Sequence, residues 1–213
     1  MTKCKVSGSI RTSDHKEPGD RVSIDQIISS QPGLIRQMSG FFTSRRIWGC
    51  TDLCDRVPDF FYVHLMRYFT FEETLIAVKY FEKILAQSGH HVKHYHADNG
   101  VFAQNSFPES INKKDQKITF CAVCAHHQNV IIENKKKMLT LSVRTLLLNA
   151  IRHWPKIIDL MFWPFAMKAA AERHNTLSVN SNIKKTVFNF VQPGNRDHPC
   201  EIIPRPLLSC LCT

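Results

Sequence analysis

The sequence predicts an α/β domain, because segments with strand character alternate with segments of helical periodicity along most of the chain. Residues 48–69 are rich in aromatic and β-branched residues, as in the strands of a meander. The best helix is expected at residues 131–150, where apolar residues recur on one broad face. With 213 residues, of which 43% are hydrophobic, the chain is long enough to bury one core.

Both ends of the chain are expected to lie outside this domain. Residues 1–30 contain few apolar positions and no sustained period, which predicts a disordered lead-in. Residues 31–175 form the expected domain with a following helix. Residues 176–213 are expected to be an irregular tail, because periodicity is lost and prolines are frequent near the end.

The first half of the domain carries clear start and stop signals. A strand is expected at residues 60–65, after Pro58. Thr70 and Glu73 have the spacing of a capping box, in which the threonine hydroxyl accepts from the Glu73 amide and the Glu73 side chain reaches back to the Thr70 amide. Gly89 is expected to end the helix that starts there.

In the second half, short strands and helices alternate. Strands are expected at residues 92–97 and 117–122, with a short helix at residues 108–112 between them. The long helix at residues 131–150 carries Glu133 in its first turn. Pro155 ends that region, and a second helix is expected at residues 157–171.

Two acids have surroundings that suggest a shared site. Asp98 closes an aromatic strand and is followed by Asn99-Gly100, which predicts a turn. Glu133 lies 35 positions later, behind a polar His126-His127-Gln128-Asn129 loop. Such an arrangement directs both carboxylates to one point, where hard divalent cations prefer oxygen ligands.

These motifs resemble the catalytic core of retroviral and retrotransposon integrases, especially those of copia-type elements. The resemblance covers residues 31–181 and includes the segment from Trp154 to Asn175 that follows the core. It implies a ribonuclease-H-like fold, a mixed sheet flanked by helices. It also implies DNA integration by metal-dependent polynucleotidyl transfer, that is, 3′-end processing and strand transfer.

The resemblance implies a third carboxylate, which it places at Asp55. Asp55, Asp98 and Glu133 would be both the catalytic residues and the ligands of two Mg²⁺ or Mn²⁺ ions, with Asp55 bridging the two. Here the chain departs from the family pattern, because Asp52 falls where an apolar strand residue belongs. A buried unpaired carboxylate costs on the order of several kcal/mol, so either the strand shifts or the site is damaged.

The resemblance also suggests DNA-binding residues: His127, Gln128 and Asn129 in the loop before the helix, and Lys136 and Lys137 behind Glu133. Simpler interpretations remain open. Asn129 is equally suited to cap the helix. Lysines 135–137 are equally suited to a solvated helix face.

The net charge of +10 and a pI near 9.3 favour a polyanionic partner, which agrees with DNA. No apolar run approaches the roughly 18 residues that a membrane helix requires, so no membrane partner is expected. Scattered cysteines and the lack of a signal peptide predict an intracellular protein, in the nucleus or cytoplasm. A homo-oligomer is expected if the chain is active.

Other departures from the family leave two alternatives open. Relatives have glycine at the positions of Ala122, Cys124 and Val130, and a β-branched residue at the last stiffens the loop, which predicts weakened or lost activity. One alternative is therefore a non-catalytic nucleic-acid-binding remnant of a transposable element. The other is a zinc site, whose candidate ligands are Cys121, Cys124, His126 and His127, with Cys50 and Cys54.

Overall fold

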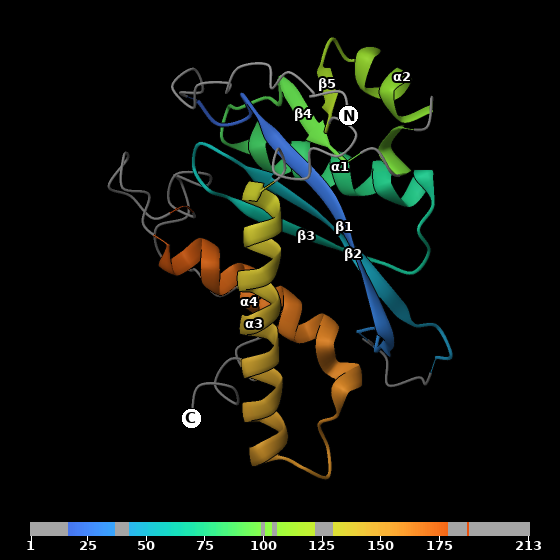
Figure 1. The fold of residues 1–213 in the computed structure, drawn as a ribbon, viewed down its shortest axis with the longest axis vertical. Coiled ribbons are helices and arrows are strands. Elements are labelled where there is room, and N and C mark those ends of the chain that lie inside the picture. The colour runs from blue at the N-terminus through green and yellow to red at the C-terminus, as the bar shows by residue number, and fades with distance from the viewer. Residues whose placement is uncertain are drawn as a thin grey trace, which may run out of the picture.

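The computed structural model describes residues 17–36, 43–98, 101–103, 106–121, 130–178 and 187. These residues form a mixed five-stranded sheet with helices on both faces, the predicted ribonuclease-H-like fold (Figure 1). The strands are β1 (Val22–Gly33), β2 (Ile47–Asp55), β3 (Phe61–Met66), β4 (His94–Ala97) and β5 (Lys117–Phe120). The helices are α1 (Phe71–Gln87), α2 (Ser106–Asn112), α3 (Val130–His153) and α4 (Trp163–Leu177), with single turns at Val101–Ala103 and Leu160–Phe162.

The strand order is β3-β2-β1-β4-β5, so β1 lies at the centre of the sheet. β1 and β3 each pair antiparallel with β2. β4 pairs parallel with both β1 and β5. Parallel strands need a crossover connection, and α1 and α2 provide the crossovers to β4 and β5.

The two faces of the sheet are covered by different helices (Figure 1). One apolar cluster joins Ile24 and Leu53 of the sheet to the α1 residues Val78 and Phe81. The opposite cluster joins sheet residues such as Cys54 to α3 and α4. Side chains alternate along a strand, so the face on which each sheet residue lies can be assigned from its neighbours.

Helix α1 has the predicted cap, with one difference. The Thr70 hydroxyl accepts from the Glu73 amide at 3.3 Å, as the capping box requires. The Glu73 carboxylate instead accepts from the amides of Arg67 and Tyr68, at 3.0 and 2.7 Å. Gly89 has φ of +77°, the left-handed conformation that suits glycine just beyond a helix. The predicted end of the helix is confirmed.

Two predicted segments were wrong. Residues 22–30, expected in a disordered lead-in, form most of β1, because Val22 and Ile24 bury one face of a strand whose intervening residues are polar. The helix expected at residues 157–171 begins later, as α4 at Trp163, and extends to Leu177. Pro164 suits its first turn. Among the described residues, no helix has the length and apolar character to cross a membrane.

Candidate carboxylate site

The adjacent strands β1 and β4 place Asp25 and Asp98 next to each other. Their parallel register pairs Val22 with Tyr95 and Ile24 with Ala97. Asp25 follows Ile24 in β1, and Asp98 follows Ala97 at the end of β4. Because the two strands run parallel, the backbones of Asp25 and Asp98 lie side by side. Ile24 faces α1, so its neighbour Asp25 faces α3. The sequence predicted Asp98 at the end of its strand but missed Asp25.

Helix α3 brings Glu133 to the same face of the sheet. Glu133 lies in the first turn of α3, as predicted, and is partly exposed. Lys136 follows it by three positions and therefore lies on the same side of the helix. The Lys136 ammonium forms a close ion pair with the Asp25 carboxylate and donates to the Gln26 carbonyl at 3.0 Å. The start of α3 is thus fixed against β1 next to Asp25.

The Cys121 thiol lies within electrostatic range of all three acids. Cys121 directly follows β5, and its amide donates to the Ala97 carbonyl at 3.0 Å. Burial raises the pKa of this thiol, and the negative charges of Asp98, Asp25 and Glu133 raise it further. Acids from β1, the end of β4 and α3 therefore all lie within electrostatic range of this thiol.

Asp55 does not join this group. It ends β2 two residues after Leu53, which packs on the α1 side, so its side chain points away from α3. It is fully buried and accepts from the amides of Gly19, at 2.6 Å, and Val57, at 3.2 Å. Burial raises its pKa to about 7, although both hydrogen bonds act to lower it. Its contacts are those of a residue that holds the segment before β1 against the sheet.

Asp52 lies where the sequence predicted an apolar residue, and it is fully buried. It is directly opposite Asp25 in the β1–β2 pairing and faces α3. One of its oxygens accepts from the Cys50 thiol at 3.2 Å, and the other has no hydrogen-bond partner among the described residues. Burial raises its pKa to about 7, while the Cys50 hydrogen bond and the charge of Lys136 act to lower it. The strand has not shifted, and the carboxylate remains in the core.

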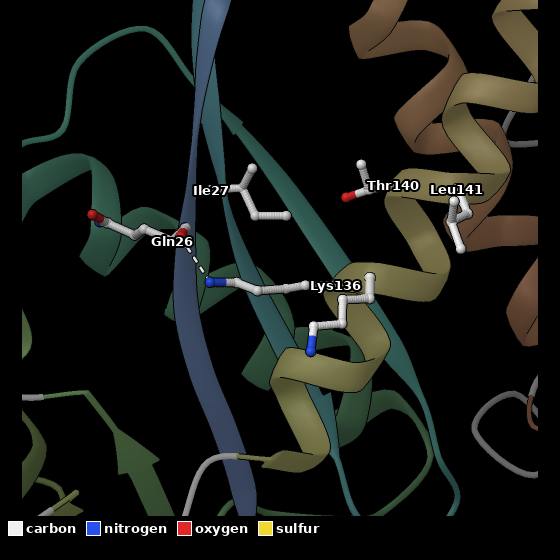
Figure 2. A pocket seen from close by; sticks show the side chains of 6 residues that line it. Gln26, Ile27, Lys136, Thr140 and Leu141 are labelled. Atoms are coloured by element: carbon white, nitrogen blue, oxygen red, sulfur yellow. Dashed lines mark hydrogen bonds between the residues drawn. The ribbon is translucent and has the colours of Figure 1, made fainter. Parts of the chain in front are cut away.

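The three consecutive lysines of α3 differ in their surroundings. Lys135 pairs with Asp59, which His174 of α4 also contacts at 3.4 Å. Lys136 pairs with Asp25, so it is not a solvated side chain. Lys137 is exposed. Lys136 and Lys137 line a pocket of about 600 Å³ between β1 and α3 with Gln26, Ile27, Thr140 and Leu141 (Figure 2).

The other predicted DNA-binding residues, His127, Gln128 and Asn129, lie outside the described residues. The same is true of Cys124 and His126 in the alternative zinc site. Its remaining thiols are not gathered together: Cys50 and Cys54 are buried in the cluster beneath α3 and α4, whereas Cys121 lies beyond β5, 3.5 Å from His96 Nε2. Burial raises the pKa of Cys50 and Cys54, which disfavours the thiolates that bind zinc.

The acids suit a divalent cation in chemistry but not in their present arrangement. Carboxylate oxygens from three elements are suitable ligands for Mg²⁺ or Mn²⁺. Within the ranges that the structure describes, however, no three His, Cys, Asp or Glu side chains are arranged to hold a metal ion. Both oxygens of Asp25 already have partners. One of its oxygens accepts from the Gln26 amide at 2.7 Å, and the other is paired with Lys136.

Comparison with known proteins supports the fold. The chain is similar to the HTLV-2 integrase catalytic core domain, solved in complex with magnesium in a trimeric form, with 17% identity, a TM-score of 0.56, and coverage of 81% of this chain and 96% of that one. It is similar to the simian T-cell lymphotropic virus intasome in complex with the PP2A regulatory subunit B56 gamma, with 15% identity, a TM-score of 0.59, and coverage of 89% of this chain and 62% of that one. It is also similar to the catalytic core domain of BIV integrase, with 9% identity, a TM-score of 0.54, and coverage of 82% of this chain and 95% of that one. No family model and no curated protein matches the sequence. The chain therefore has an integrase-like fold.

Proposed function

We propose that this chain is an integrase-like polynucleotidyl transferase of a copia-type transposable element that acts on DNA, with Asp25, Asp98 and Glu133 as its carboxylates. The observation that supports it best is the parallel register of β1 and β4, which places Asp25 beside Asp98 on the sheet. The charges of Asp25, Asp98 and Glu133, from three different elements, also all act on the Cys121 thiol. Asp25 replaces Asp55 in this proposal, because Asp55 points to the α1 face and accepts from two backbone amides.

Each acid has a position that suits the chemistry. Asp25 lies on the rigid central strand, Asp98 follows the neighbouring strand, and Glu133 comes from the first turn of a 24-residue helix. Divalent cations held by such carboxylates activate the attacking oxygen and stabilise the leaving oxygen during phosphoryl transfer. The HTLV-2 core domain was solved with magnesium, which makes Mg²⁺ or Mn²⁺ the proposed ion here.

DNA would lie over the face that carries α3. The net charge of +10 favours binding of a polyanion. Exposed Lys137, one turn after Glu133, is the lysine in the best position to contact a phosphate near the carboxylates. Because the HTLV-2 core is described in a trimeric form, we also propose that the chain self-associates when it is active.

One observation favours a second candidate, a nucleic-acid-binding domain without catalysis. The ion pair between Lys136 and Asp25 neutralises a carboxylate that a metal ion would need. If that pair never opens, the domain would bind DNA through its basic surface and would not react with it.

A DNA-joining assay with labelled oligonucleotide ends separates the two candidates. The chain is incubated with Mn²⁺, beside Asp98→Asn and Glu133→Gln. We expect joined products from the unchanged chain, their loss in both variants, and unchanged DNA affinity in all three. Joining that survives both substitutions would contradict the carboxylate assignment. DNA binding without joining in any of the proteins would support the non-catalytic candidate.

A further inference from the structure

We propose that Lys136 is an internal counter-cation of the carboxylate site: its ammonium takes the place of a divalent cation at Asp25, so that metal binding requires this side chain to leave. The inference rests on the proposed function for the identity of the site. It adds a regulatory contact that neither the motifs nor the fold predict.

The contacts of Lys136 support this role. Its side chain extends from α3 across to β1, where the ammonium reaches the Gln26 carbonyl, as the dashed line in Figure 2 shows. The same ammonium is paired with Asp25. The Lys136 and Asp25 side chains are only 22% and 17% exposed, so solvent screens the pair weakly. A partly buried pair with an additional hydrogen bond is a fixed contact.

Asp52 supplies a second, independent observation. It is fully buried and lies opposite Asp25 on the neighbouring strand, and in the part of the chain that the structure describes one of its oxygens has no hydrogen-bond partner. Two carboxylates on adjacent strands need positive charge nearby. Lys136 provides it from α3, and half-buried Lys168 of α4 provides more, since both act electrostatically on Asp52. The α3 face of the sheet therefore holds two neighbouring acids whose negative charge the lysines offset in part.

This arrangement has a direct consequence for cation binding. A divalent ion at Asp25 must displace an ammonium from a partly buried carboxylate, which weakens its apparent affinity. The pocket between β1 and α3 lies beside the Lys136 stem and gives the displaced side chain a place to move. Removal of the ammonium should therefore strengthen metal binding, whereas loss of a lysine that only contacts DNA should leave the metal affinity nearly unchanged.

The test is a calorimetric titration with Mn²⁺ of the full chain and of Lys136→Met, which keeps an unbranched apolar stem without charge. Lys137→Met is the matched control, because it removes the same charge from the next residue of the helix. We expect Lys136→Met to bind Mn²⁺ more tightly than the unchanged chain by about tenfold or more, and Lys137→Met to stay within about twofold. Asp25→Asn added to Lys136→Met should remove the gain.

Thermal unfolding provides a second readout. The Lys136→Met variant should gain more in Tm on addition of Mn²⁺ than the unchanged chain does, because ligand binding to the folded state stabilises it. If Lys136→Met fails to fold, Lys136→Gln serves instead, since its amide keeps a donor for the Gln26 carbonyl and removes the charge.

The outcomes separate this inference from the proposed function. Equal Mn²⁺ affinity of the unchanged chain and Lys136→Met, at a site that Asp98→Asn and Glu133→Gln abolish, overturns the role of Lys136 and leaves the proposed function standing. An equal gain in Lys136→Met and Lys137→Met also overturns it, since general charge would then explain the effect. No Mn²⁺ uptake by either folded protein overturns both proposals.

Discussion

The two faces of the central sheet differ in the number of their acidic residues and in the partners of those residues. On the α1 face the packed residues are apolar, and Asp55 at its edge accepts from two backbone amides. On the α3 face, Asp25 and Asp52 lie side by side on adjacent strands, and lysines from α3 and α4 offset their charge only in part. The α1 face has the character of a structural core. The α3 face contains buried charged residues that stability alone does not require, which is typical of a functional site.

The largest effect is expected in the α1 core. Phe81 is fully buried and stacks on Phe60 with ring centroids 6.0 Å apart. Phe81→Ala removes this contact and leaves a cavity, so we expect a loss of about 3–5 kcal/mol in the free energy of unfolding, measured with urea. A loss below about 1 kcal/mol would show that this face is not the main core.

The next effect tests the structural role of Asp55. Asp55→Ala leaves the amides of Gly19 and Val57 without their acceptor, and we expect a loss of about 1–3 kcal/mol in stability. Mn²⁺ affinity should not change, because this side chain points away from the other acids. Reduced Mn²⁺ binding by a folded Asp55→Ala protein would return Asp55 to the metal site.

On the α3 face, removal of a charge should stabilise the protein in a pH-dependent manner. In the folded state Asp52 has a pKa of about 7, above its ordinary value of 3.8. The folded state therefore binds more protons than the unfolded state between about pH 4 and pH 7, and stability falls as pH rises through that window. Asp52→Val should gain about 1–3 kcal/mol at pH 8.

That gain should shrink as the pH falls and approach zero below about pH 4, where Asp52 becomes protonated in both states. Urea denaturation of the variant and the unchanged chain at pH 8 and pH 5 measures the difference. An equal gain at both pH values would mean that packing, and not the buried charge, is responsible. Destabilisation at pH 8 would show that the carboxylate has a partner that offsets its burial.

The smallest effect on stability is expected for Lys135, and this prediction distinguishes it from the adjacent Lys136. Lys135 pairs with Asp59 at the turn before β3, away from Asp25. Because this pair is partly exposed, we expect Lys135→Met to cost about 1 kcal/mol or less in stability. It should not raise Mn²⁺ affinity, in contrast to Lys136→Met. A comparable rise would show that any lysine near the start of α3 controls the site.

Local sequence signals predicted much of the fold. The Thr70 cap, the stop at Gly89 and the position of Glu133 in the first turn of a long helix depend on residues close in sequence. The position of Asp98 at the end of an aromatic strand was also predicted from residues close in sequence. The integrase-like topology came from the family resemblance, and the strand order agrees with it.

The first strand was missed for a physical reason. Segment 22–33 contains only a short alternation of apolar and polar residues, followed by Ser29, Ser30 and Gln31, which resembles a loop. The alternation of Val22 and Ile24 with Ser23 and Asp25 was the signal that could have identified it. Without β1, the family resemblance placed the third carboxylate at Asp55. The pairing of β1 with β4 reveals Asp25 as the neighbour of Asp98.

The most direct test compares Asp25 with Asp55 in one background. Mn²⁺ titration of Lys136→Met is repeated after Asp25→Asn and, separately, after Asp55→Asn, with circular dichroism to verify folding. We predict that Asp25→Asn abolishes Mn²⁺ binding and that Asp55→Asn preserves it, because Asp25, unlike Asp55, shares the α3 face with Asp98 and Glu133. Binding that survives Asp25→Asn and is lost with Asp55→Asn would contradict the proposed carboxylate site.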